Sequence, residues 1–232
     1  MDIDLLDGLD EQVALVTGAT RGIGEQIALG LADLGATVYG GARETGDISH
    51  DSLIPIQLDV TADRDIATTI ETIDDAHGHL DILVNNAGIG GPRAPLHRNE
   101  MADIDDTLDV NLRGPIHLTR SALPLLLRND GGRVVNVSSG MGALGEGMSG
   151  HYPAYRISKA GLNGLTVYLH GEYAEEGLIA NTACPGWVRT ELGAPEAPKS
   201  PAEGAETPIW LARFTPGSPG GTFWRDLSPI DW

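Results

Sequence analysis

The sequence predicts an α/β fold, with one doubly wound parallel sheet of about seven strands and helices on both faces. Short apolar runs alternate with segments of helical periodicity along the whole chain, and no linker or internal repeat divides it. The 31 glycines gather around the apolar runs of the first half, which indicates tight turns between strands and helices. Apolar residues make up 41% of the chain, enough to fill a core. We therefore expect residues 1–232 to form a single domain.

The individual elements follow from the spacing of apolar residues. Continuous apolar runs bounded by turn residues are typical of buried strands, and they occur at residues 12–17, 36–41, 53–58, 80–84, 133–137, 178–183 and 221–224. Apolar residues three or four positions apart, such as Ile23, Ile27 and Leu31, indicate helices at residues 23–34, 62–76, 100–129 and 154–176. Pro115 and Pro124 predict breaks or a kink in the third helix. Residues 193–208, rich in Pro, Ala and Glu, are expected to form a mobile loop followed by one short helix.

Composition restricts the class of protein. The net charge of −18, from 33 acidic and 15 basic residues, argues against nucleic-acid binding, which needs clustered Lys and Arg. The single cysteine, Cys184, allows no intrachain disulfide and fits a reducing compartment. Residues 1–12 are acidic, unlike a signal peptide, and no apolar run approaches the ~20 residues of a membrane span. We expect a cytoplasmic protein that binds neither nucleic acid nor membranes.

The basic residues are divided unevenly, with thirteen Arg and only two Lys. An acidic surface almost free of lysine favours solubility at high salt, so the chain is predicted to come from a halophile. A GC-rich genome, which favours arginine codons, is the alternative explanation.

A glycine-rich turn, T-G-A-T-R-G-I-G, joins the first predicted strand to the first helix at residues 17–24. Its glycines let the backbone approach a pyrophosphate closely, and the amino end of the helix attracts the negative charge. This position is the one that a dinucleotide-binding motif requires, and a tight turn without a ligand is the alternative. The residues expected to contact a dinucleotide here are Gly18, Thr20, Arg21, Gly22, Ile23 and Gly24.

The spacing G-x3-G-x-G after a threonine resembles the cofactor motif of the classical short-chain dehydrogenase/reductase family. Three further segments resemble motifs of that family: L-D-V at 58–60, N-N-A-G at 85–88 and P-G-W-V-R-T at 185–190. The resemblance spans nearly the whole chain and implies a Rossmann-type NAD(P)-binding domain that transfers hydride. It implies further cofactor contacts by Asp59, Val60, Asn86, Ala87, Gly88, Pro185, Gly186, Val188 and Thr190.

The end of the second predicted strand indicates which nicotinamide cofactor is used. NAD-dependent proteins usually place an acid there for the ribose 2′-hydroxyl, whereas this strand ends Y-G-G-A-R and has no acid before Glu44. Arg43 and Arg21 can instead pair with a 2′-phosphate. We expect NADP(H). The less favoured alternative is NAD(H), with Glu44 on the ribose and Arg43 in solvent.

Tyr155 and Lys159 are spaced i, i+4 near the start of a predicted helix, so both side chains lie on one face. A neighbouring ammonium lowers the pKa of a phenol, ordinarily about 10, and so eases proton transfer at neutral pH. The family resemblance implies that Tyr155 is the general acid/base and that Lys159 also holds the cofactor ribose. Tyr152, with Arg156 four residues later, competes for the first role, but Pro153 separates it from the helix.

Two more catalytic residues are assigned through the resemblance. Ser139, the second serine after the fifth predicted strand, is expected to donate a hydrogen bond to the substrate carbonyl, and Ser138 points the other way by strand alternation. Asn111 is expected to kink its helix and to hold a water that relays protons through Lys159. The seven histidines show no metal-ligand spacing, so no metal is expected.

Residues 140–151 and 191–208 are expected to form the walls of a substrate pocket. The stretch VNVSSGMG and the ending FWRDLSPIDW resemble carbonyl-reductase-like members, which implies NADPH-dependent reduction of a small or medium aldehyde or ketone, reversible as alcohol oxidation. His151 is interpreted as a lining residue, Cys184 as a packed residue and Lys199 as solvated. The expected lining is mostly apolar and consists of Met141, Leu144, Met148, His151, Trp187 and Leu192.

Other functions remain open. A 3-oxoacyl thioester reductase would share every catalytic residue, although no Arg cluster for a nucleotide-bearing thioester is present in the sequence. A sugar or polyol dehydrogenase is a further alternative. A non-catalytic cofactor-sensing protein is a remote one, because such relatives often lose the tyrosine or the lysine.

The resemblance also implies an assembly. Classical members commonly pair two long helices, here residues 109–129 and 154–176, as a four-helix bundle, which predicts a homodimer or homotetramer. Carbonyl-reductase-like members with a long insertion before the tyrosine can be monomers, but the insertion here is only a few residues.

Overall fold

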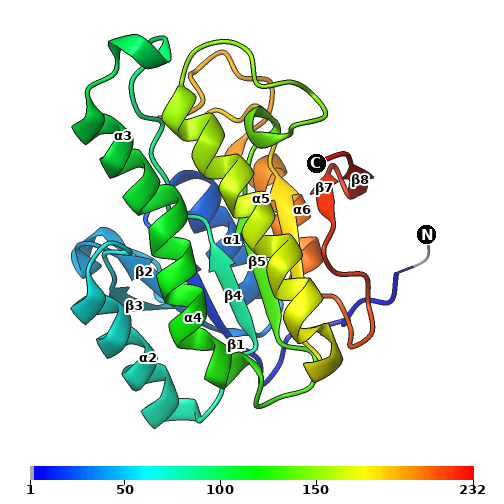
Figure 1. Cartoon of the computed structure of the whole chain (residues 1–232). Helices are drawn as coiled ribbons and strands as arrows, with labels where there is room; N and C mark the ends of the chain where they lie inside the picture. The colour runs from blue at the N-terminus through cyan, green and yellow to red at the C-terminus, as the bar shows by residue number, and fades with distance from the viewer. Residues whose placement is uncertain (1–2) are drawn as a thin grey trace.

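The computed structural model describes residues 3–232 and has the predicted fold class (Figure 1). Within these residues, one eight-stranded sheet runs in the order β3-β2-β1-β4-β5-β6-β7-β8, and all neighbouring strands are parallel except β7 and β8. The strands are β1 (Val13–Thr17), β2 (Thr37–Ala42), β3 (Leu53–Gln57), β4 (Ile82–Asn85), β5 (Arg133–Val137), β6 (Ile179–Cys184), β7 (Phe223–Arg225) and β8 (Ser228–Ile230).

Helices cover both faces of the sheet, as Figure 1 shows. They are α1 (Gly22–Asp33), α2 (Asp63–His77), α3 (Met101–Leu108), α4 (Gly114–Leu126), α5 (Pro153–Tyr173) and α6 (Pro201–Leu211). α1 and α6 pack on one face, where Ile27 and Leu211 are buried, and α2, α4 and α5 pack on the other, where Ile66, Leu118 and Leu169 are buried. No helix among residues 3–232 combines the length and apolar character needed to cross a membrane.

β1 shows how one sheet supports two cores. Ala14 and Val16 contribute to the core under α1 and α6, whereas Val13 and Leu15 contribute to the core on the opposite face. Successive side chains of a strand point to opposite faces, so both faces need apolar residues. β1, β4, β5 and β6 are buried along their full lengths, which explains the continuous apolar runs in the sequence.

The long helix predicted at residues 100–129 is interrupted by a π-helical turn, Asp109–Arg113, which separates α3 from α4. Pro115 lies four residues after Asn111 and has no N–H to donate to its carbonyl, so the turn lies where a break at Pro115 is predicted. Pro124 lies inside α4 and does not end it.

The predicted loop at residues 193–208 contains the start of α6, which is a correction. Ser200 Oγ accepts a hydrogen bond from the Glu203 N–H at 3.2 Å, and the Glu203 carboxylate accepts from the Ser200 N–H at 2.7 Å. This capping box starts the helix at Pro201 despite the mixed composition of the segment. The sheet also has one strand more than the seven expected. This strand, β8, was not predicted because it has only three residues, one of them Pro229.

Candidate active site

The candidate site lies at the carboxyl ends of the central strands. The chain turns from β1 toward β2 and β3 on one side, whereas β4 and the later strands lie on the other. The strand order thus reverses between β1 and β4, which is where sheets of this type have a crevice for a ligand. The motif segments 17–24, 85–88, 138–142 and 185–190 begin at the ends of β1, β4, β5 and β6. The predicted cofactor and catalytic motifs therefore meet at one edge of the sheet.

The turn after β1 fits a pyrophosphate. Gly18 and Gly22 have φ angles of +66° and +62°, which glycine adopts without strain. A Cβ at Gly24 would lie 2.2 Å from the Gly18 carbonyl oxygen, so only glycine lets the turn and α1 pack this closely. Within the described residues, no side chain caps the start of α1, which leaves its first N–H groups free to bind an anion. These features fit a dinucleotide cofactor.

Asn86 connects the end of β4 to this turn. Its Nδ2 donates to the carbonyl oxygens of Thr17 and Gly18 at 2.9 and 3.3 Å. The Thr17 hydroxyl accepts from the N–H groups of Asn86 and Ala87, both at 2.9 Å. Asn86 therefore shapes the turn, and its direct contact with a cofactor stays a prediction.

Arg21 and Arg43 have exposed side chains beyond the carboxyl ends of β1 and β2. Arg21 precedes α1 and forms an ion pair of 2.6 Å with Glu191. The pKa of Asp59 is lowered, first by hydrogen bonds from Thr61 and to a smaller extent by the charge of Arg43. Arg43 thus lies near enough to act on Asp59, in the segment 58–60 that is expected to contact the cofactor.

Ser139, Tyr155 and Lys159 come together beside the end of β5. The Ser139 hydroxyl accepts from the Met141 N–H at 3.1 Å and lies near enough to the Tyr155 phenol to lower its pKa. Lys159 Nζ lies 5.6 Å from the centre of the Tyr155 ring. Ser138 is buried and donates to the Lys159 carbonyl at 3.2 Å, so strand alternation separates the two serines as predicted.

Burial controls the proton affinities of this group. It raises the pKa of Tyr155 to about 12, against the opposite effect of the nearby Ser139 hydroxyl, and it lowers the pKa of Lys159 to about 8. Burial, rather than the charge of Lys159, therefore sets the direction of the Tyr155 pKa shift in the chain without a cofactor. Since this pKa lies far above neutrality, Tyr155 carries its proton at pH 7.

Lys159 retains capacity for a ligand. Among the described residues, its Nζ donates to the Val137 carbonyl at 2.8 Å, and an ammonium has three donors. The remaining donors fit the ribose hydroxyls of a nicotinamide cofactor.

The π-helical turn places Asn111 next to the site. Asn111 Oδ1 accepts from the Ile89 N–H at 2.8 Å, and its Nδ2 donates to the Ile89 carbonyl at 2.8 Å and to Ser158 Oγ at 3.1 Å. A Cβ at Gly88 would lie 3.3 Å from Asn111 Oδ1 and 3.6 Å from Lys159 Nζ, so these polar groups flank Gly88. The irregularity predicted at Asn111 is present as this π-helical turn, and the proton relay stays a prediction.

The expected substrate walls expose apolar side chains. Trp187 is 53% exposed, and its Nε1 donates to the Gly193 carbonyl, which orients the indole. Tyr152, the alternative catalytic tyrosine, directly precedes α5 with φ of +66° and lies outside the helix as predicted. Of the predicted lining residues, Met141 is half-buried and the others are exposed, namely Leu144, Met148, His151, Trp187 and Leu192.

A buried chain of polar side chains beneath the site was not predicted. Asn85 Nδ2 donates to Asn136 Oδ1 at 2.8 Å, Asn136 Nδ2 donates to Thr166 Oγ1 at 2.8 Å, and the Thr182 hydroxyl donates to Thr166 Oγ1 at 2.7 Å. This chain links β4, β5, α5 and β6, so it fixes the helix that carries Tyr155 against the sheet. The only signal in the sequence was an asparagine inside the apolar run R-V-V-N-V.

Two minor predictions about single residues have opposite outcomes. Cys184 is buried, as expected. The prediction that Lys199 is solvated is wrong, because its side chain is 25% exposed and donates to Asp226 and to the Pro185 carbonyl.

Comparison with known proteins identifies the family. The family model described as short chain dehydrogenase matches residues 12–200, and the chain belongs to this family. The chain is 36% identical over 190 residues to the 3-oxoacyl-[acyl-carrier-protein] reductase of Vibrio cholerae, covering 79% of this chain and 76% of that protein. It is 37% identical over 191 residues to the cis-4-hydroxycyclohexanecarboxylate dehydrogenase of Sinomonas cyclohexanicum, covering 78% of this chain and 75% of that protein.

A solved structure adds the cofactor of a relative. The short-chain dehydrogenase of Shigella flexneri, solved in complex with NADP, is 27% identical to this chain and has a TM-score of 0.85. The match covers 94% of this chain and 98% of that chain. The chain is therefore an NAD(P)-dependent oxidoreductase of the short-chain type with a Rossmann-like fold.

Proposed function

We propose that this oxidoreductase is a carbonyl-reductase-like member of its family, which uses NADPH to reduce a small or medium aldehyde or ketone reversibly to an alcohol. The observation that carries the proposal is the grouping of Ser139, Tyr155 and Lys159 beside the cofactor crevice, between walls that expose apolar side chains. Walls of this kind suit an uncharged carbonyl compound.

The surroundings of each catalytic residue support a distinct role. Bound NADPH supplies the hydride that adds to the carbonyl carbon. Ser139 donates a hydrogen bond to the carbonyl oxygen, and Tyr155, protonated at neutral pH, transfers its proton to that oxygen. Lys159 holds the ribose with its remaining donors, and its charge stabilises the phenolate that Tyr155 becomes. Asn111 holds a water that returns a proton through Lys159.

The proposed cofactor is NADP(H), because Arg21 and Arg43 can pair with a 2′-phosphate and the end of β2 lacks an acid. The NADP bound to the relative from Shigella flexneri supports this choice. We assign residues 1–232 to one NAD(P)-binding domain with substrate segments 140–151 and 191–208. The proposed cofactor contacts are Gly18, Thr20, Arg21, Gly22, Ile23, Gly24, Arg43, Asp59, Val60, Asn86, Ala87, Gly88, Tyr155, Lys159, Pro185, Gly186, Val188 and Thr190.

The test is oxidation of NADPH and of NADH in molar KCl with aldehydes, ketones, diketones and 3-oxoacyl thioesters. We expect turnover of simple carbonyl compounds with NADPH. A preference for NADH would show that Arg21 and Arg43 do not bind a 2′-phosphate on the ribose. Tight nucleotide binding without turnover of any compound would favour the cofactor-sensing alternative.

Substitution of the two tyrosines tests the mechanism. Tyr155→Phe is expected to bind NADPH normally and to lose nearly all turnover, because the phenol is the proton donor. Tyr152→Phe, which changes the tyrosine before α5, is the matched control and should remain active. Activity in the first variant with loss in the second would refute the assignment.

A second candidate function is reduction of a 3-oxoacyl thioester. It is favoured by the 36% identity to the Vibrio cholerae enzyme, which is named for that activity. Faster turnover of a 3-oxoacyl thioester than of any simple ketone would select it. A sugar or polyol dehydrogenase is the third candidate, and the same panel extended to sugars tests it.

We also propose a homodimer or homotetramer that pairs α4 and α5 of neighbouring chains. Ile116 on α4 and Ile157 and Tyr168 on α5 are 42%, 49% and 57% exposed, which supports an apolar contact there. The charge of −18 and the two lysines support a cytoplasmic protein of a halophile. Assembly should therefore loosen as salt is removed and repulsion grows. A molecular mass by light scattering that is equal in low and high salt would contradict this.

A further inference from the structure

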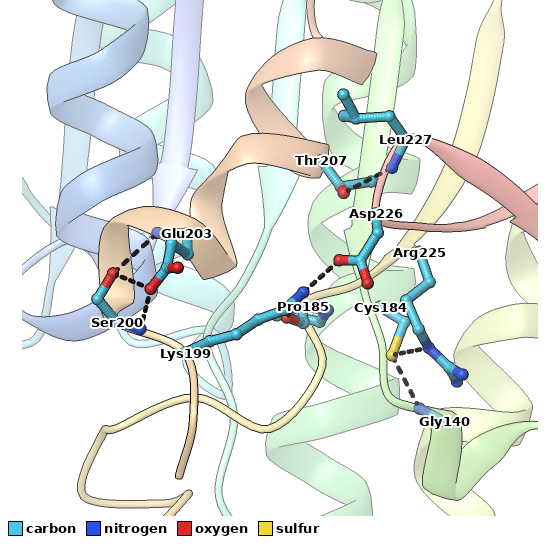
Figure 2. Close-up of polar contacts among 10 residues, drawn as sticks. All are labelled: Gly140, Cys184, Pro185, Lys199, Ser200, Glu203, Thr207, Arg225, Asp226 and Leu227. Atoms are coloured by element: carbon cyan, nitrogen blue, oxygen red, sulfur yellow. Dashed lines mark hydrogen bonds and ion pairs between the residues drawn. The ribbon is translucent and has the colours of Figure 1, made fainter.

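Two adjacent residues in the β7–β8 turn, Arg225 and Asp226, each bind a different wall of the candidate substrate pocket. Arg225 forms a bidentate ion pair with Glu146, in the segment 140–151, at 2.8 and 3.0 Å. Asp226 accepts a hydrogen bond from Lys199 Nζ, in the segment 191–208, as Figure 2 shows. Two walls that lie far apart in the sequence are thus joined through one turn.

Arg225 also lies against Gly140, the residue that follows Ser139. Its Nε donates to Cys184 Sγ at 3.3 Å, and the Gly140 N–H donates to the same sulfur at 3.2 Å (Figure 2). A Cβ at Gly140 would lie 2.5 Å from Arg225 Nη2, so the guanidinium touches the residue that follows Ser139. Glu146 raises the pKa of Arg225, and Arg225 lowers the pKa of Glu146. The pair therefore stays charged over a wide pH range and holds the first wall where it leaves β5.

Lys199 connects Asp226 to the segment 185–189 beside the second wall. Its Nζ also donates to the Pro185 carbonyl at 3.3 Å (Figure 2). Its N–H donates to the Trp187 carbonyl at 3.3 Å, and its carbonyl accepts from the Arg189 N–H at 2.8 Å. Asp226 thereby holds the segment that carries the exposed indole of Trp187.

The turn is built from residues that rarely adopt its geometry. Asp226 and Leu227 have φ angles of +53° and +60°, between the paired residues Arg225 and Ser228. Two-residue hairpins with both central φ angles positive normally use Asn-Gly or Asp-Gly, and a leucine there is strained. The Leu227 N–H donates to Thr207 Oγ1 on α6 at 3.3 Å, which holds the turn in place (Figure 2). Strain that the surrounding structure maintains often marks a functional position.

We propose that Arg225 and Asp226 are positioning residues that keep the two walls at a fixed separation and so set the size of the carbonyl compound that fits between them. This inference rests on the proposed function, because it assigns specificity to the same site. Neither residue contacts the reacting atoms, so both act through Glu146 and Lys199.

The kinetic test uses Arg225→Met, Glu146→Gln and Asp226→Asn, with a small aliphatic ketone and a bulky aryl ketone. Each variant should raise the KM of the small ketone about two- to fivefold, the upper part of the range for a partly exposed ion pair, and leave kcat and the KM of NADPH unchanged. The kcat/KM of the bulky ketone relative to the small one should rise. The double variant Arg225→Glu with Glu146→Arg should restore part of the original ratio, because it keeps the ion pair but loses the Nε contact with Cys184.

The matched control is Arg128→Met. It removes an ion pair of similar exposure between Arg128 and Asp74, which joins α2 to the end of α4. This variant should change neither KM nor the size ratio, which is the kcat/KM of the bulky ketone divided by that of the small one. A size ratio unchanged in all three test variants, or an equal loss for both ketones, would overturn the proposal, because a general structural defect does not discriminate by size.

Hydrogen exchange gives a readout that does not need turnover. The amides of residues 143–150 in Glu146→Gln and of 186–192 in Asp226→Asn should exchange about fivefold faster, with other amides unchanged. If the wild-type chain reduces no carbonyl compound, the proposed function fails and exchange alone decides the positioning role. Wild-type exchange rates in both variants would refute that role. Glu146 is 45% exposed, so Glu146→Gln keeps the test valid even if Arg225→Met does not fold.

Discussion

Lys159 is expected to weaken the fold that carries it. The residue is 4% exposed, and burial lowers its pKa from 10.5 to about 8. At about 1.4 kcal/mol per pH unit, keeping the ammonium charged at pH 7 costs about 3 kcal/mol of unfolding free energy. The unfolded lysine keeps its proton up to pH 10.5, whereas the folded one loses it near pH 8. The cost therefore disappears as the pH rises between these two values.

Lys159→Met removes the charge and keeps most of the apolar stem. The variant loses the hydrogen bond to the Val137 carbonyl, which is worth about 1 kcal/mol. We therefore expect Lys159→Met to be about 2 kcal/mol more stable than the wild-type chain at pH 7 and to have no advantage near pH 10.5. Its turnover should be lost, because the ribose contact and the charge beside Tyr155 are gone.

The assay is urea unfolding without cofactor, in molar KCl at pH 7 and pH 10, followed by the fluorescence of the four tryptophans. Lys199→Met is the matched control, because Lys199 binds Asp226 at the surface and its loss should bring no gain at either pH. A Lys159→Met chain less stable than wild type at pH 7 would refute the reasoning. A gain of equal size at both pH values would show that packing, rather than charge, is responsible.

Three other substitutions test the cofactor site and the polar chain below it. Glu191→Gln removes the carboxylate that pairs with Arg21 at 2.6 Å, so the KM of NADPH should fall about two- to threefold while the KM of NADH stays unchanged. Glu196→Gln is the control. Equal shifts of the KM of both cofactors would argue against a contact of Arg21 with the 2′-phosphate. Gly24→Ala puts a methyl 2.2 Å from the Gly18 oxygen and should weaken both cofactors about tenfold or more in fluorescence titration, whereas Gly171→Ala, with open space around it, should bind them normally. Asn136→Ala leaves Asn85 and Thr166 without their shared partner and should lower the unfolding free energy by about 2 kcal/mol; an unchanged urea midpoint would contradict this.

The sheet and its flanking helices were predictable because they rest on local patterns. β1, β4, β5 and β6 are buried on both faces, so most of their residues are apolar, and that pattern is visible in one sequence. The helical periodicity of α1 and α2 likewise follows from one buried face each. The start of α6 was missed because its capping box, not apolar spacing, begins the helix.

The site was predictable only as far as its motifs extend along the chain. The glycine turn and the Tyr155–Lys159 pair depend on fixed spacings within a few residues. Arg225 and Glu146 are 79 residues apart in the sequence, and Asp226 and Lys199 are 27 residues apart. No local sequence pattern predicts contacts over such separations. The sign of the Tyr155 pKa shift was also missed, because it depends on the burial of the phenol, which spacing does not reveal.

The largest departures from ordinary sequence rules gather at the candidate site. The π-helical turn interrupts a long helix at Asn111, Lys159 is a buried cation, and Leu227 holds a left-handed conformation in the turn that joins the two walls. Each of these features costs stability, so each needs compensation from its neighbours. The neighbours that supply it are Ile89, which binds both ends of the Asn111 amide, and Thr207, which binds the Leu227 N–H. If Lys159→Met stabilises the chain while abolishing turnover, the same trade of stability for activity explains why the buried cation is kept.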